Sequence, residues 1–568
     1  MRTNRSIAIF NRIVRLLLPI ILIFQFLPYK SNITAQTFQM QGRTYEKING
    51  IWYNFWDGEL GDQIIPHTLI VRLPDKASVN EFEFSSIGLN NIFVASNELA
   101  GGYYIIKVED QSDPFVTASI ISNSGFFDYV EFDALGEILD VPNDPLYNYQ
   151  WGPPKISLPS AWDITTGAND IILAIIDSGI DYKHEDLANK IWNNLGEDYD
   201  SDGHTLEWNG STWVLDPGDI NGVDDDNNGR IDDLIGWDFW DYLNGGDKDP
   251  FPTPVQGQPG ENPHGTAVAG IAAAQTNNGL GIAGVAGGWG SNTGVKLMNL
   301  RYYWKNDPPT AAASSSALCL QYAYENGADV INMSFAWRAP YTYMETACST
   351  AANGYDCVLV AGSGNSGGEY SNDKSVRYPA KYDWVIAVGA TDHNDSRWVD
   401  PDPNSAYGSC FGPELDLMAP GGESTIYTTD IAGPEGDNTY DENYLNNFGG
   451  TSASAPVVAG VAALIRSIDP DLSWEEVRNI LHNSAVKVSG MGDQNRTDEY
   501  GYGRIDANLA LVLTRGYGHI NKNISFSHDV QLSGDLIVDE GVTLTIEPGR
   551  YSHISLRRRD ACLWNSHG

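Results

Sequence analysis

Five continuous apolar runs constrain the fold of this chain more than any other feature of its sequence. They cover residues 170–179, 294–300, 328–334, 357–365 and 384–390, and helix-like segments such as 264–275, 317–327 and 454–468 lie among them. Runs of this kind are typical of strands that are covered on both faces of a parallel sheet. We therefore predict an α/β domain over residues 141–515, with a doubly wound, mainly parallel sheet and helices on both faces.

The first residues predict export. Residues 1–35 have a basic first half, an apolar stretch from Leu16 to Pro28, and small residues near Ala35. This is the layout of a cleaved secretory signal. The apolar run is shorter than the roughly 20 residues of a spanning helix, and no later segment comes close. We expect no stable membrane span after signal cleavage.

Two further segments flank the predicted domain. Residues 36–140 mix strand-like and helix-like stretches and predict a small α+β unit, and the Pro- and Asp-rich residues 141–155 predict an exposed linker. Residues 516–568 predict a β-rich C-terminal fragment, either a short all-β piece or one rung of a β-solenoid. The stretch from Arg550 turns abruptly basic, which suggests that the β domain is truncated.

The charge balance bears on partners. With 34 Lys and Arg against 74 Asp and Glu, the formal net charge is −40, which would repel nucleic acid. Carboxylate-rich loops are instead suited to hard cations such as calcium. The five cysteines have no CxxC spacing; Cys348 and Cys357 can pair across a short loop, but no disulfide framework is implied.

Three polar residues lie where a doubly wound sheet places its ligands. Asp177 follows an apolar run, where a carboxylate needs a partner such as an imidazole N–H; the alternative is a turn-forming Asp. His264 opens an Ala-rich helix and taken alone is more often structural than catalytic. Ser452 stands at the start of another helix, where it either caps the helix or presents a nucleophile.

Together these residues supply a nucleophile, a base and an orienting carboxylate, which is what nucleophilic acyl transfer requires. The strings DSGID at 177–181, HGTAVAG at 264–270 and GTSASAP at 450–456 occur in this order. With them the chain resembles the subtilisin-like serine proteases over residues 140–513. The resemblance implies that Asp177 orients His264, that His264 acts as general base and acid, and that Ser452 is the nucleophile.

An oxyanion needs hydrogen-bond donors aimed at the developing charge. Asn365 follows a buried strand, at the position where the resemblance implies an oxyanion-binding amide, and the backbone N–H of Ser452 is the expected second donor. The string GNSGG also fits a hydrolase elbow with Ser366 as nucleophile. An elbow should open an apolar helix, and a polar stretch follows instead.

The resemblance extends to the substrate groove. It implies that two edge segments pair with an extended peptide by β-augmentation. Ala336 stands where relatives commonly have Gly, which crowds the primary side-chain pocket. The implied substrate-binding residues are Ser334, Phe335, Ala336, Ala361, Gly362 and Ser363.

The long insertion between Asp177 and His264 contains a loop with EF-hand-like spacing. Oxygen ligands fall at its positions 1, 3, 5 and 9, Gly229 at position 6, and Ile235 rather than Glu at position 12. Asp233 can substitute for the missing Glu, and the alternative is a solvated acidic turn. The predicted calcium ligands are Asp224, Asp226, Asn228 and Asp232.

The sequence therefore predicts a secreted or cell-surface serine endopeptidase, monomeric, acting on protein or peptide substrates. Residues 36–140 resemble a family propeptide that inhibits the enzyme and assists its folding, with autocleavage between Ala134 and Pro145. The alternative from another class is a non-catalytic surface or adhesion protein with a protease-like fold.

Overall fold

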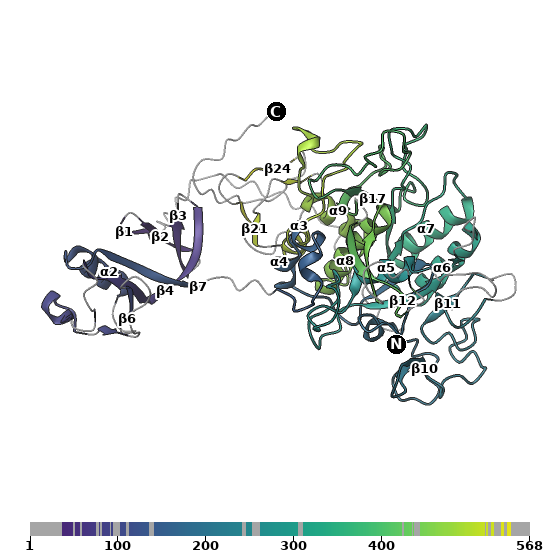
Figure 1. Ribbon diagram of the computed structural model, residues 1–568, viewed down its shortest axis with the longest axis horizontal. Helices are drawn as coiled ribbons and strands as arrows, with labels where there is room; N and C mark the ends of the chain where they lie inside the picture. The colour runs from purple at the N-terminus through teal and green to yellow at the C-terminus, as the bar shows by residue number, and fades with distance from the viewer. Residues whose placement is uncertain are drawn as a thin grey trace, which may run out of the picture. The chain divides into compact units, whose positions relative to one another are not determined.

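The computed structural model (Figure 1) divides into two compact units, Met1–Glu137 and Ile138–Gly568. The signal-like residues 1–35, Cys562 and the basic stretch from Arg550 lie outside the described residues. The structure describes residues 37–41, 43–48, 51–56, 59–74, 79, 82–90, 92–94, 103–108, 113–135, 141–240, 246–252, 262–304, 310–422, 425–433, 436, 443–516, 518–520, 524–526, 536–538 and 542–546.

In the described residues of the N-terminal unit, an antiparallel sheet is accompanied by one α-helix, α2 (Pro114–Asn123). The strand order is β1-β2-β3-β4-β6-β5, and β7 also pairs with the long strand β4. Asp113 caps α2 by accepting hydrogen bonds from two backbone N–H groups of its first turn. The strands are β1 (Thr37–Met40), β2 (Arg43–Ile48), β3 (Ile51–Trp56), β4 (Glu59–Arg72), β5 (Ile92–Val94), β6 (Tyr103–Val108) and β7 (Tyr129–Leu135).

The second unit is built on the predicted parallel sheet, whose order is β11-β12-β8-β15-β16-β17-β18. Every neighbouring pair in it is parallel. All five apolar runs form strands, so this part of the α/β prediction is confirmed. The strands are β8 (Ile172–Asp177), β11 (Gly236–Asp238), β12 (Lys296–Arg301), β15 (Val330–Met333), β16 (Val358–Gly362), β17 (Val385–Thr391) and β18 (Leu417–Pro420).

Helices cover both faces of this sheet. In every strand of the sheet except β11, alternate side chains join two separate cores, one with α5 (His264–Ala273) and α8 (Thr451–Ile468), the other with α6 (Ala313–Glu325) and α7 (Thr342–Tyr355). Against expectation, α8 is long and apolar enough to cross a membrane, but most of it is buried. It is apolar on all sides because it lies inside the domain.

The strand order reverses direction at β8. Its neighbours β12 and β15 lie on opposite sides of it, although both follow it in the chain. In an open α/β sheet, ligands bind at the carboxyl ends of the strands beside such a switch point. The fold therefore places Asp177, the last residue of β8, where a binding crevice is expected.

Residues 141–155 are not an exposed linker, and that prediction is wrong. Leu146 and Tyr147 are buried in the core of the second unit, and the Asp144 carboxylate accepts a hydrogen bond from the Asn277 backbone N–H at 2.7 Å. The Gln150 side-chain amide bonds both backbone groups of Ala283. The polar residues that suggested a loop are binding partners for another segment.

The described part of the C-terminal region consists of two parallel strand pairs, β21 with β23 and β22 with β24. Paired residues are separated by 18 positions in the first pair (Gly518 with Leu536) and 20 in the second (Ile524 with Leu544). Their apolar side chains pack against α9 (Trp474–Ser484) and α10 (Ala507–Arg515). These strands are β21 (Gly518–Ile520), β22 (Ile524–Phe526), β23 (Leu536–Val538) and β24 (Leu544–Ile546).

The remaining elements are short or peripheral. Cys319, Cys348, Cys357 and Cys410 are buried free thiols, so the pairing of Cys348 with Cys357 is not formed. The other elements are α3 (Gly152–Lys155), α4 (Leu158–Trp162), α9 (Trp474–Ser484), α10 (Ala507–Arg515), β9 (Leu206–Trp208), β10 (Trp213–Leu215), β13 (Tyr303–Trp304), β14 (Thr310–Ala311), β19 (Ile426–Thr429) and β20 (Tyr444–Phe448), with 3-10 turns at Phe84–Ile87, Tyr147–Tyr149, Ala188–Lys190 and Ser489–Met491.

Candidate active site

Asp177 and His264 form a hydrogen-bonded pair. Asp177 ends β8 and His264 begins α5, and the Nδ1 atom of His264 lies 2.8 Å from Asp177 Oδ1. The Asp177 side chain is 1% exposed and that of His264 is 24% exposed. The carboxylate also accepts the Ser178 backbone N–H at 2.7 Å. A buried carboxylate is thereby given an imidazole as its partner, while one edge of the ring reaches solvent.

Two further hydrogen bonds join the turn after Asp177 to the start of α5. The Gly265 backbone N–H donates to Ser178 Oγ at 2.9 Å, and the Asp181 N–H donates to Thr266 Oγ1 at 2.9 Å. Gly265 is required here, since a Cβ atom on it would lie 2.3 Å from the Gly179 carbonyl oxygen. Residues 177–181 and 264–266 are therefore hydrogen-bonded to each other, which fixes the His264 imidazole against the Asp177 carboxylate.

The pKa of His264 is raised above its ordinary value of 6.5. Burial is the largest single influence and lowers the pKa, but the charge of Asp177 and its hydrogen bond together outweigh it. The ring also meets Phe448 edge-on, with centroids 5.3 Å apart. Phe448 ends β20 just before the loop that leads to Ser452, so the imidazole lies beside that loop.

Ser452 is the second residue of α8, and Gly450 precedes the helix. Gly450 has φ 82°, and a Cβ atom there would approach the Asn365 side chain to about 3 Å. The Ser452 hydroxyl donates to the Ser334 carbonyl oxygen at 3.3 Å. The first backbone N–H groups of a helix have no partner within the helix, so the backbone N–H of a residue at this position is suited to bind a developing anion.

Asn365 is held by the residue that precedes Ser452. Its Oδ1 atom accepts the Thr451 backbone N–H and the Thr451 hydroxyl, both at 2.9 Å. Because the amide oxygen is bound in this way, the orientation of the amide nitrogen is set. Ser366, the alternative nucleophile, is followed by no helix in the described stretch 363–384.

A cavity of about 290 Å³ opens beside Ser452. Four of the six predicted substrate-binding residues, Ser334, Phe335, Ala336 and Gly362, line it. Ala361 and Ser363 do not, because Ala361 lies in a sheet core and the buried Ser363 hydroxyl donates to the Cys410 carbonyl. The remaining lining residues are Trp337, Arg338, Gly364, Asn365, Ser366, Arg377, Thr451 and Ser452.

Arg377 brings positive charge to the wall of this cavity. The residue is 4% exposed, and its guanidinium forms an ion pair with Asp373 and donates to the Asp373 backbone oxygen at 2.7 Å. Its Nε atom has no hydrogen-bond partner among the described residues. Arg338, which is exposed, adds a second cation to the same lining.

The acidic loop brings three of the four predicted metal ligands together. The Asn228 backbone N–H donates to Asp224 Oδ1 at 3.0 Å and to Asp226 Oδ1 at 2.9 Å. Asp232 does not join them, because its carboxylate binds Lys248 Nζ at 2.7 Å. Its neighbour Asp233 does, since the Asn228 side-chain amide donates to Asp233 Oδ2 at 2.8 Å.

Asp233 and Glu197 make this loop fit a cation. Glu197, Asp226 and Asp233 each offer a carboxylate oxygen within 4.8 Å of the others. Burial raises the pKa of Asp233 to about 7, partly offset by hydrogen bonds from Tyr322 and Asn228. Its Oδ1 atom is buried without a hydrogen-bond partner among the described residues. Such an oxygen is suited to a hard cation.

Sequence reasoning missed Ser178, Thr451, Arg377 and Glu197. Ser178 and Thr451 are direct neighbours of the predicted catalytic residues Asp177 and Ser452, and no periodicity marks them. Arg377 follows Asn365 by 12 residues, in a stretch without a helix where no pattern marks it as a cavity residue. Glu197 lies 27 residues before Asp224, outside the loop with EF-hand-like spacing.

A doubly wound parallel sheet with a carboxylate, an imidazole and a hydroxyl at its carboxyl edge is an architecture of serine hydrolases. Residues 168–503 match the subtilase family, Peptidase_S8, which is more than half of the chain. The chain belongs to this family and is a serine-type endopeptidase.

Three relatives illustrate the match. The chain is 32% identical to the halolysin-like extracellular serine protease Nep of Natrialba magadii, over 78% of this chain and 67% of that protein. It is 32% identical to thermitase of Thermoactinomyces vulgaris, over 65% of this chain and 99% of that protein. It is 30% identical to the calcium-dependent protease of Trichormus variabilis, over 63% of this chain but only 48% of that protein.

Proposed function

We propose that Asp177, His264 and Ser452 form the catalytic triad of a secreted endopeptidase. The observation that carries this proposal is the 2.8 Å contact between His264 and a buried Asp177 at the end of β8. The Ser452 hydroxyl is bonded to Ser334, directly after the neighbouring strand β15. The carboxylate fixes the imidazole with Nδ1 bound, which leaves Nε2 to accept a proton. Secretion is supported by the signal-like residues 1–35 and by the extracellular relative.

In this mechanism the Ser452 hydroxyl oxygen attacks the peptide carbonyl carbon and its proton passes to His264. The C–N bond then breaks, and His264 returns the proton to the leaving amine. A water molecule attacks the acyl ester with His264 as base, which releases the acid and restores Ser452. The Asn365 amide and the Ser452 backbone N–H donate to the oxyanion at each tetrahedral stage.

The cavity beside Ser452 is proposed to receive the substrate side chain that precedes the cut bond. Segments 334–336 and 361–363 would pair with the peptide backbone as added strands. Arg377 and Arg338 are the charged residues of the described lining, Arg377 being paired with Asp373 outside it, and Ala336 is proposed to narrow the cavity. This charge favours an acidic or amide side chain over a large apolar one.

Residues 36–140 are proposed to act as a propeptide that the enzyme removes itself. The support is an autonomous antiparallel unit with its own core, joined to the second unit near Glu137. Calcium is proposed to bind the loop 224–233 through Asp224, Asp226, Asn228, Asp233 and Glu197, with Asp232 held by Lys248. When bound, the ion would neutralise buried carboxylates and take no part in the reaction.

Labelling with a serine-directed fluorophosphonate tests the proposed nucleophile. We expect the mature protein to be modified at Ser452, and the full-length Ser452→Ala variant to remain unlabelled and uncut. Ser366→Ala is the matched control and should label normally. Labelling at Ser366, or efficient self-processing of pure Ser452→Ala protein, would refute the assignment. The family membership leaves no observation that favours the non-catalytic alternative.

A further inference from the structure

A second acidic loop precedes the proposed calcium loop and repeats its sequence. Residues 198–203 read DYDSDG and residues 224–229 read DDDNNG, so oxygen-bearing side chains occupy positions 1, 3 and 5 of each loop and glycine occupies position 6. The β9–β10 hairpin lies between the two loops.

The two loops also share one backbone conformation. The residues at position 4 are both left-handed, with φ 63° at Ser201 and 60° at Asn227, and the glycines have φ 94° and 90°. In both loops the backbone N–H groups at positions 5 and 6 donate to the carboxylate at position 1. The distances are 3.2 Å and 2.9 Å to Asp198, and 3.0 Å and 3.0 Å to Asp224.

A buried carboxylate is aimed into the first loop. Asp219 is fully buried, and its Oδ1 atom accepts the Tyr199 backbone N–H at 2.8 Å. Its Oδ2 atom is buried without a hydrogen-bond partner among the described residues. Asp198, Asp200 and Asp219 offer oxygens within 4.8 Å of one another. A carboxylate oxygen desolvated beside two other carboxylates is costly unless a cation neutralises it.

The surrounding segment supplies almost no positive charge. Residues 197–233 contain 12 Asp and Glu but a single Arg and no Lys. Lys248, from outside the segment, binds Asp232 of the second loop. His204 is within ion-pair distance of Asp202 and Asp216, but no described Lys, Arg or His is at that distance from Asp198, Asp200 or Asp219.

We propose that Asp198, Asp200 and Asp219 bind a second calcium ion, in addition to the one proposed for loop 224–233. All three ligands are carboxylates, and calcium prefers an all-oxygen set with flexible geometry. The site does not depend on the catalytic assignment of Ser452.

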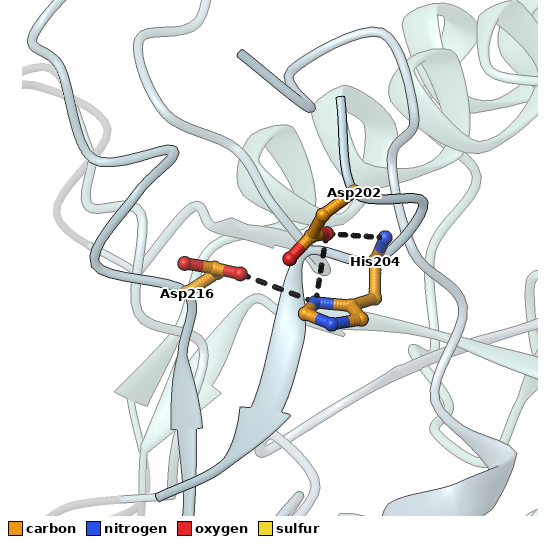
Figure 2. A group of neighbouring side chains, drawn as sticks. All are labelled: Asp202, His204 and Asp216. Atoms are coloured by element: carbon orange, nitrogen blue, oxygen red, sulfur yellow. Dashed lines mark hydrogen bonds and ion pairs between the residues drawn. The ribbon is translucent and has the colours of Figure 1, made fainter. Parts of the chain in front are cut away.

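A neighbouring group offers a different metal chemistry and serves as the rival. Figure 2 shows the His204 ring between the carboxylates of Asp202 and Asp216, with Nδ1 3.1 Å from an oxygen of each. An imidazole with two carboxylates would suit a softer ion such as zinc. The His204 ring lies within ion-pair distance of both carboxylates, whereas Asp219 has no cationic side chain at that distance among the described residues.

Calcium stoichiometry distinguishes these sites. The full-length Ser452→Ala protein is stripped with chelator and titrated with CaCl₂ by calorimetry. We expect Asp219→Asn to lose one equivalent of calcium relative to this parent, Asp233→Asn to lose one, and the double variant to lose two. His204→Gln is the matched control and should keep every equivalent.

Each arm has an outcome that decides between the sites. An unchanged equivalent count in Asp219→Asn, with at most a threefold change in affinity, would overturn the proposal. Loss of the ion in His204→Gln would move it to the group in Figure 2 and also overturn the proposal. If only Asp233→Asn keeps its count, the proposed ion in loop 224–233 fails and the second site stands. Should Asp219→Asn lose its circular dichroism spectrum, Asp198→Asn, at a half-buried position, replaces it with the same expectation.

Discussion

The carboxyl edge of the parallel sheet and the acidic segment 197–233 both bury carboxylates, but they balance the charge differently. At the sheet edge, His264 lies 2.8 Å from Asp177, so the chain itself provides the partner. Among the described residues, the ion pairs of the acidic segment are those of Asp202 and Asp216 with His204 and of Asp232 with Lys248, so Asp219 and Asp233 have no cationic partner. The comparison separates a site assembled by folding alone from one that a cation from solution completes.

The largest expected effect comes from removing the internal partner. Asp177→Asn should lower kcat/KM about 10⁴-fold, because the imidazole loses its orienting carboxylate. Neutral His264 is the active base, so activity is lost as pH falls through its pKa, which lies above 6.5. Without Asp177 that pKa falls, and the acidic limb of the pH–rate profile should move to lower pH. A limb that stays in place would contradict the pairing.

The oxyanion donor gives the next largest effect. Asn365→Ala should lower kcat about 10²- to 10³-fold with little change in KM, because the amide binds charge that develops only in the transition state. Steady-state kinetics on a short peptide substrate measure it. Asn353→Ala, on the exposed side of α7, is the control and should leave kcat unchanged. A rise in KM alone would show that Asn365 binds substrate instead.

Calcium removal should act on the acidic segment and spare the sheet edge. With free calcium at about 100 times Kd, each ion stabilises the folded state by about 2.7 kcal/mol, so chelator should lower Tm by several degrees. The measurement is thermal unfolding of Ser452→Ala protein, which excludes self-digestion. An equal Tm with and without chelator would count against both calcium loops.

The smallest effect concerns specificity. Arg377→Gln should reduce the preference for an acidic over an apolar residue before the cut bond by about tenfold, the value of one lost charge contact. Cleavage of a peptide library by the mature enzyme measures the ratio, and Lys381→Gln is a control outside the cavity lining. An unchanged ratio of cleavage after acidic and apolar residues would show that Arg377 does not contribute to specificity.

Much of the fold could be predicted because buried parallel strands leave continuous apolar runs, and β8, β12, β15, β16 and β17 all follow them. The candidate triad could be proposed because Asp177, His264 and Ser452 stand at strand and helix ends. Contacts made across the chain left no local pattern. Asp232 has the right spacing for a ligand, yet Lys248 binds it, and Asp233 takes the place beside Asn228.

The prediction of an exposed linker over residues 141–155 was wrong for the same reason. Its Pro and Asp residues are typical of loops, and the sequence gives no sign that Asp144 accepts a backbone N–H from Asn277. Polarity predicted exposure, whereas the polar atoms are matched to donors and acceptors of another loop.

The hydrogen bonds of segment 141–155 also limit where a propeptide can be cut. Asn143 accepts the Gly279 backbone N–H, and Asp144 those of Asn277 and Asn278. Removal of these two acceptors would lose the net contribution of each hydrogen bond, about 0.5–1.5 kcal/mol. We expect the mature chain to begin no later than Asn143, which N-terminal sequencing will show. The hydrogen bonds of Asn143 and Asp144 should therefore set the N-terminus of the mature enzyme. Any protease that shortens the N-terminal unit is expected to stop at these residues, because the folded enzyme binds them.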